Sequence, residues 1–121
     1  MRILQYISIL LVWFAFVSAS TFDLVNARGK ITLLRIHDVG TKYGPPTDQI
    51  DVEAVITLDS RPGMAFGLQL RNDNQRVTRE GMVDLMRDAF RNNWPVSIDY
   101  TITPPKKNGV IIRVWVEKTP G

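Results

Sequence analysis

Apolar and polar side chains alternate most regularly between residues 50 and 58. The apolar set is Ile50, Val52, Ala54, Ile56 and Leu58, and the intervening set is Asp51, Glu53, Val55 and Thr57. A period of two with one apolar face predicts a half-buried strand. The segment 60–63, Ser-Arg-Pro-Gly, is typical of a tight turn. Alternation resumes from Met64 to Leu70, so the two segments are predicted to form a hairpin.

A first strand is predicted over Lys30–Val39. Its apolar phase slips by one residue between Leu33 and Leu34, which a β-bulge in a long, coiled strand would explain. The segment 41–48 contains Gly44-Pro45-Pro46 and is therefore predicted to be a loop, because proline cannot continue a strand ladder.

Helical spacing follows a polar connection at 71–77. The apolar residues of this segment are Met82, Leu85, Met86, Ala89 and Phe90. With Thr78 as the N-cap and Asn92-Asn93 at the end, they predict an amphipathic helix of about four turns.

Two further strands are predicted, at 96–102 and 110–117, joined by a proline- and lysine-rich loop at 104–109. In the last strand Val110, Ile112, Val114 and Val116 are expected to share one face, with Ile111, Arg113, Trp115 and Glu117 on the other. Phe66, Ile98 and Val114 are expected in the core.

The amino terminus has the three parts of a secretory signal: Arg2, an apolar run over 3–17, and small side chains at Ser18 and Ala19. The run is shorter than the roughly 20 residues that span a bilayer, which favours cleavage over an uncleaved anchor. The expected organisation is a signal peptide at 1–19, a lead-in at 20–29 and one domain at 30–118. This organisation predicts a secreted or periplasmic protein, with no stable membrane insertion after cleavage.

Composition narrows the function classes. The chain has 15 Lys and Arg against 12 Asp and Glu, a mild excess that argues against a nucleic-acid partner. It contains no Cys, so packing or subunit association must stabilise it without disulfides. A homo-oligomer remains compatible with this composition.

The predicted order is strand, strand, strand, helix, strand, strand. This order resembles the OB-fold, a five-stranded Greek-key barrel with a helix between its third and fourth strands. The resemblance implies a mainly β fold with one helix. The layout from Met82 through Trp94-Pro95 to Tyr100 is also similar to that of bacterial toxin B-subunits, which form ring pentamers and bind cell-surface glycans. The chain departs from those subunits in having no disulfide.

Catalytic chemistry finds little support in the sequence. His37 is the one histidine, and a sheet-face role is favoured for it over catalysis. The carboxylate pairs Asp51 with Glu53 and Asp84 with Asp88 are expected on exposed faces, where their pKa values should stay ordinary. No phosphate loop or metal-ligand spacing occurs, so neither an enzyme nor a cofactor is predicted.

A binding surface is the favoured interpretation. In the OB-fold, the loops after the first and fourth strands flank the ligand face. The residues expected there are Lys42, Tyr43, Lys106, Lys107, Asn108, Arg113 and Trp115. An aromatic plate with cations and an amide suits a glycan, and a partner protein is the other predicted ligand. The alternatives are a Trp115 packed in the core, a self-assembling structural protein, and an enzyme inhibitor that presents Tyr43–Pro46.

Overall fold

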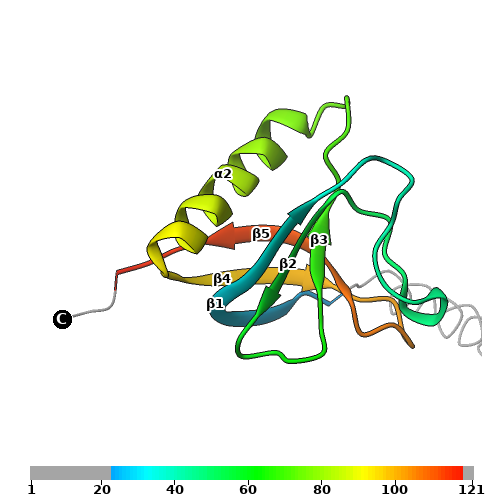
Figure 1. Ribbon diagram of the computed structural model, residues 1–121, viewed down its shortest axis with the longest axis horizontal. Coiled ribbons are helices and arrows are strands. Elements are labelled where there is room, and N and C mark those ends of the chain that lie inside the picture. Colours follow the sequence, from blue (N-terminus) through cyan, green and yellow to red (C-terminus); the bar gives the residue numbers. More distant parts are fainter. Residues whose placement is uncertain (1–22, 119–121) are drawn as a thin grey trace, which may run out of the picture.

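The computed structural model describes residues 23–118, which contain seven secondary-structure elements (Figure 1). They are β1 (Val25–Ile36), the 3-10 turn η1 (Pro46–Asp48), β2 (Ala54–Leu58), β3 (Phe66–Leu68), α2 (Arg76–Asn92), β4 (Pro95–Thr101) and β5 (Gly109–Trp115). The predicted fold class, mainly β with one helix between the third and fourth strands, is confirmed. The predicted signal at 1–19 lies outside the described residues. Within 23–118, no helix is long and apolar enough to cross a membrane.

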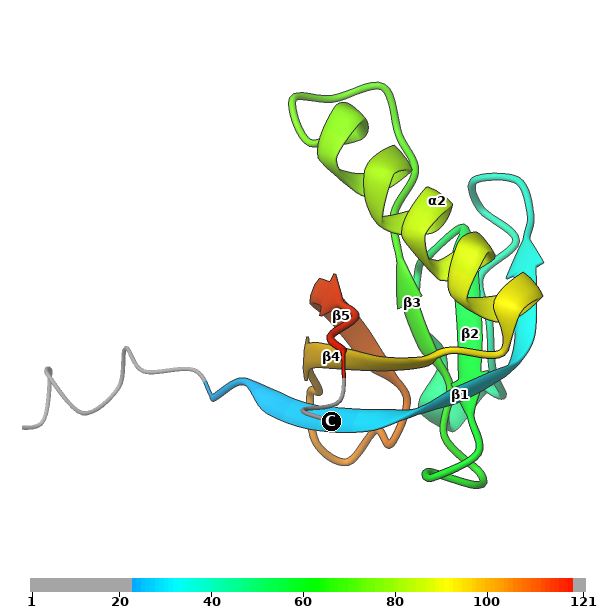
Figure 2. The same ribbon diagram turned by 90° about the vertical axis from the view of Figure 1, so that its left-hand side faces the viewer.

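The five strands close into a barrel in the order β1-β2-β3-β5-β4. Closure depends on the length and curvature of β1, which Figure 2 shows bending around the barrel. Its first half pairs with β4, from Val25↔Tyr100 to Lys30↔Pro95, and its second half pairs with β2. The only parallel contact among these strands is short, because β3 meets β5 only at Phe66↔Gly109 and Gly67↔Val110.

The predicted lead-in at 20–29 is wrong from Val25 onward, because these residues already belong to β1. Ala27 is 1% exposed and alternates with exposed Asn26 and Arg28, but Val25 and Ala27 alone make too short a period to detect. The predicted irregularity in β1 is confirmed. The register shifts between Ile31 and Leu33, slightly earlier than the slip expected at Leu34.

The main core fills the space between the barrel wall and α2, which packs against β1, β4 and β5. Phe66 and Ile98 are fully buried there, as predicted, and half-buried Val114 packs against the same cluster. The ring of Phe66 meets that of Tyr100 edge-on, with the centroids 4.7 Å apart.

The buried face of the helix includes Met86 and Ala89, as predicted, but is rotated toward Val83 and away from Phe90. Its buried residues are Val83, Met86 and Ala89, whereas Phe90 is 40% exposed. Thr78 is not the N-cap, because the helix begins at Arg76 and Gln75 occupies the capping position. Asn93 ends the helix in the left-handed conformation at φ 59°, which asparagine tolerates well.

A second register shift changes the faces of β5. Asp99 pairs with Arg113 and Tyr100 pairs with Ile111, so Ile112 is skipped. Ile111 is therefore 4% exposed and Ile112 is 45% exposed, the reverse of the predicted assignment. A bulge inserts one residue and reverses the alternation beyond it.

The strand β2 is buried on both faces, which corrects the predicted half-buried strand. Ala54, Ile56 and Leu58 belong to the main core, while Val55 joins a smaller cluster. That cluster consists of Ile50, Val52, Val55 and Ala65 beneath the loop that joins β1 to β2.

Glu53, expected on an exposed face, is 2% exposed. Its carboxylate accepts hydrogen bonds from the Leu70 backbone and from both Nε and Nη2 of Arg71, so a buried charge is fully partnered. Arg71 also reaches Asp51 at 2.8 Å, and these partners, Glu53 first, raise the pKa of Arg71 above its ordinary value.

Candidate ligand groove

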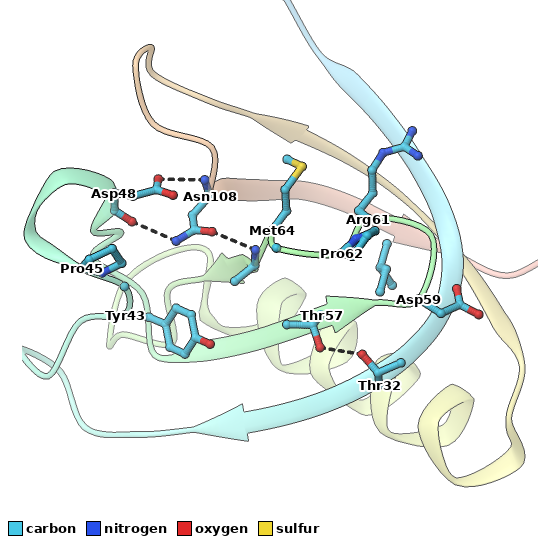
Figure 3. Close-up of a pocket in the computed structure, with 14 residues that line it drawn as sticks. Thr32, Tyr43, Pro45, Asp48, Thr57, Asp59, Arg61, Pro62, Met64 and Asn108 are labelled. Atoms are coloured by element: carbon cyan, nitrogen blue, oxygen red, sulfur yellow. Dashed lines mark hydrogen bonds between the residues drawn. The ribbon is translucent and has the colours of Figure 1, made fainter.

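An open groove of about 630 Å³ lies on the outside of the barrel, where three connections and two strands meet (Figure 3). Its walls come from the β1–β2 loop, the β2–β3 turn and the end of the β4–β5 loop, which are distant in sequence. The lining residues that matter below are Thr32, Tyr43, Asp48, Thr57, Asp59, Arg61, Met64 and Asn108.

The floor of the groove is a pair of threonines. Thr32 of β1 and Thr57 of β2 point outward because their neighbours Ile31 and Leu58 point into the core. Their hydroxyl oxygens lie 2.7 Å apart. Each hydroxyl can donate one hydrogen bond and accept others, so the pair retains capacity for hydroxyl groups of a ligand.

The β2–β3 turn forms one wall and is fastened to β1. The Asp59 carboxylate accepts the Lys30 backbone N–H at 2.9 Å, and the Ser60 hydroxyl donates to the Arg28 carbonyl. Gly63 adopts φ +80°, a conformation that glycine takes without steric cost. Side chains of Arg61 and Met64 lie along this wall (Figure 3).

The opposite end of the groove is held by a polar latch, which we define as Asp48, Asn108 and the Ala65 backbone. One carboxylate oxygen of Asp48 accepts the backbone N–H groups of Lys107 and Asn108 at 2.8 and 2.9 Å. The Asn108 amide donates to the Asp48 carbonyl at 2.9 Å and accepts the Ala65 N–H at 2.9 Å. The latch therefore joins the β1–β2 loop, the β4–β5 loop and the end of the β2–β3 turn into one unit.

Gly44 is required by this arrangement. It has φ +103°, and a Cβ built there would lie 2.5 Å from the Asp48 carbonyl oxygen and 2.9 Å from the Asn108 amide nitrogen. Any side chain at this position would strain the backbone and push the latch apart.

Tyr43 stands beside the latch with its ring directed across the groove toward Thr57 (Figure 3). Its backbone exchanges two hydrogen bonds with Ile50, at 2.9 and 2.8 Å, which fix the base of the loop. The Arg35 guanidinium lies 5.6 Å from the ring centroid, within cation–π range. The side chain is therefore held in place before any ligand arrives.

The structure brings some of the predicted binding residues together and separates others. Tyr43 and Asn108 line the groove, and the exposed Lys42 and Lys107 are adjacent to them in the two loops. Lys106 is half-buried in the β4–β5 loop. Asn108 is 6% exposed, and its amide is used within the latch.

Arg113 and Trp115 do not line the groove, so the single surface expected from the loops and the last strand is divided. Arg113 forms an ion pair with Asp99 of the neighbouring strand at 3.1 Å. Trp115 is half-buried, opposite Ser97 on β4, and its ring nitrogen donates to Glu117 at 3.3 Å.

Several groove residues were missed in the sequence, among them Thr32, Thr57, Asp59 and Arg61. The two threonines carry no motif, and their approach depends on the β1–β2 register. The Pro62-Gly63 turn was recognisable, but its position against β1 follows from barrel curvature, which local sequence does not encode.

His37 contributes to the loop rather than to the groove. Its Nε2 lies 2.7 Å from the Val52 carbonyl and therefore donates, and its buried Nδ1 has no hydrogen-bond partner among the described residues. Within residues 23–118, no three His, Asp or Glu side chains gather closely enough to hold a metal ion.

Comparison of the chain with protein-family models, curated proteins and solved structures found no match.

Proposed function

We propose that this protein is a non-catalytic binding module that acts outside the cytoplasm and holds a glycan in the groove. The observation that carries the proposal is the polar latch, because Asp48 and Asn108 join three distant segments into a preformed wall. A wall that is ordered before binding loses little conformational entropy when a ligand arrives.

The chemistry of the lining favours a sugar. Thr32 and Thr57 offer hydroxyl donors and acceptors, Asp59 offers a carboxylate acceptor, and Tyr43 offers an aromatic face. Sugars present hydroxyl groups at their edges and C–H groups on their faces, which these side chains complement. The secretory pattern in residues 1–19 supports a place of action where free glycans and cell-surface glycans occur.

A glycan array tests the proposal on the mature chain. We expect one reproducible glycan class to bind, and we expect Tyr43→Ala and Thr57→Val each to weaken it by roughly tenfold, the value of one good hydrogen bond or contact. The melting temperature should change little for Thr57→Val, whereas Tyr43→Ala should lower it moderately, because half-buried Tyr43 packs against the cluster of Ile50, Val52, Val55 and Ala65.

Thr101→Val is the matched control, since Thr101 is a half-exposed threonine on β4 that does not line the groove. Equal weakening by Thr57→Val and Thr101→Val would place the binding surface elsewhere. If no glycan binds, the proposal fails.

A further inference from the structure

Cations are distributed unevenly over the molecule. Those around the groove are Arg28, Lys30, Arg35, Lys42, Arg61, Lys106 and Lys107, and within residues 23–118 none of them has an ion-pair partner. Most cations elsewhere in the described residues are paired. Arg71, Arg76, Arg79, Arg87 and Arg113 each pair with Asp or Glu, and the exceptions are Arg91 and Lys118.

The unpaired cations lead into the groove along β1. Arg28, Lys30 and Thr32 are exposed and alternate with buried Ala27 and Ile31, so the first three share the outer face. The Ser60 hydroxyl bonds the Arg28 carbonyl, which places the turn that carries Arg61 beside the same strand. Beyond the bulge, Arg35 lies over Tyr43 at the far end of the groove. The result is a basic rim that runs along one side of the groove.

The charged side chains that line the groove itself are acidic, except for Arg61. They are Asp48, whose carboxylate accepts two backbone N–H groups, and Asp59. Asp59 would repel a phosphate placed on the floor but accepts a hydroxyl hydrogen. Tyr43 is the only aromatic residue that lines the groove in the described chain, and Arg35 already lies near its ring. Single-stranded nucleic acid normally needs several free aromatic faces for base stacking.

We infer, building on the proposed function, that the ligand is an acidic polysaccharide. Its hydroxyl groups lie on the threonines of the floor and on Asp59 of the wall, and its carboxylate or sulfate groups lie against the rim formed by Arg28, Lys30 and Arg61. An extended chain with regularly spaced acidic groups fits this arrangement, because the cations follow a strand rather than converge on one point.

The test uses polysaccharides of defined charge with the full mature chain. Polygalacturonate, hyaluronan and dextran sulfate are the acidic probes, dextran and hydroxyethyl cellulose are the neutral probes, and oligo(dT) is the nucleic-acid probe. By titration calorimetry at low salt, we expect at least one acidic polysaccharide to bind roughly tenfold or more tightly than either neutral one and than oligo(dT). Raising the salt should weaken that complex, since exposed charges are screened.

Two charge-matched double variants locate the effect. Arg28→Gln with Lys30→Gln should weaken the acidic probe by roughly tenfold or more. Arg87→Gln with Arg91→Gln should leave it within about twofold, because these exposed cations lie on α2, outside the groove and its rim. Equal weakening by both variants would show that net charge alone attracts the ligand, and would overturn the inference.

The remaining outcomes separate this inference from the proposed function. If dextran or hydroxyethyl cellulose binds as tightly as the acidic probes, and Thr57→Val weakens it, the groove binds glycans and the acidic inference is wrong. If oligo(dT) binds as tightly as the acidic polysaccharides, the ligand class is wrong. If no polysaccharide of either kind binds, both proposals fail.

Discussion

The helix-covered core and the loop-covered end of the same barrel are stabilised in different ways. Beneath α2, a large cluster that includes Phe66, Met86 and Ile98 excludes water almost completely. At the loop-covered end the buried apolar cluster is smaller and consists of Ile50, Val52, Val55 and Ala65, and the polar latch supplies directional bonds in addition. Apolar burial is non-directional, whereas hydrogen bonds fix loop geometry.

The difference indicates that one region of this small domain provides stability and the other fixes the shape of the groove. The main core gives most of the free energy of folding, since that term grows with buried apolar area. The loop end contributes less area but holds the groove in a single shape. Substitutions in the main core should therefore lower the global stability. Substitutions at the loop-covered end should increase local opening and alter binding.

The largest effect is expected from Phe66→Ala. Phe66 is fully buried and contacts Tyr100, so its truncation should lower the free energy of unfolding by about 3–5 kcal/mol. Urea denaturation measures this loss. Phe90→Ala is the control. Because Phe90 is 40% exposed, its truncation should lower the free energy of unfolding much less. Similar losses from both would contradict the position assigned to the helix.

Glu53 and Asp51 provide the next comparison, since both bind Arg71 and they differ in burial. Glu53→Ala should lower the free energy of unfolding by about 2–3 kcal/mol, because it leaves the Leu70 N–H without its acceptor beside a buried cavity. Asp51→Ala should lose less than about 1 kcal/mol, as expected for an exposed pair. If the two substitutions lower the free energy of unfolding equally, the burial of Glu53 does not determine its contribution to stability.

Asn108→Ala tests the latch directly. It removes both side-chain bonds, and we expect a loss of about 1–2 kcal/mol in the free energy of unfolding. Amide hydrogen exchange distinguishes local from global opening. The Ala65 amide should exchange faster, while the Ile98 amide should follow global unfolding.

Asn92→Ala is the matched control for the latch, because Asn92 is exposed and bonds only the Asp88 carbonyl near the end of the helix. An Ala65 amide that exchanges equally in both variants would show that Asn108 does not hold this end of the barrel.

Sequence patterns predicted the fold well because its strands and helix carry periodic apolar residues. The order of elements, the bulge in β1 and the core positions of Phe66 and Ile98 all follow from such periods. Burial of Glu53 and the meeting of Thr32 with Thr57 do not, since each depends on a partner distant in sequence. Much of the groove was therefore not predictable, although two of the residues predicted to bind a ligand, Tyr43 and Asn108, line it.

The smallest effect is expected at Ile112, where the sequence and the structure disagree most clearly. Alternation places Ile112 in the core and Ile111 outside, but the bulge opposite Asp99 and Tyr100 reverses them. Ile112→Ala should change the free energy of unfolding by about 0.5 kcal/mol or less, as is usual for an exposed position. Ile111→Ala should lose about 2–5 kcal/mol, because Ile111 is 4% exposed within the main core. Denaturant titration of the two variants under identical conditions measures the difference, and the two residues share side-chain chemistry and strand. A larger loss at Ile112 than at Ile111 would mean that β5 continues without a bulge. Arg113 would then keep its outward position and its ion pair with Asp99, and only the residues before the bulge would exchange faces.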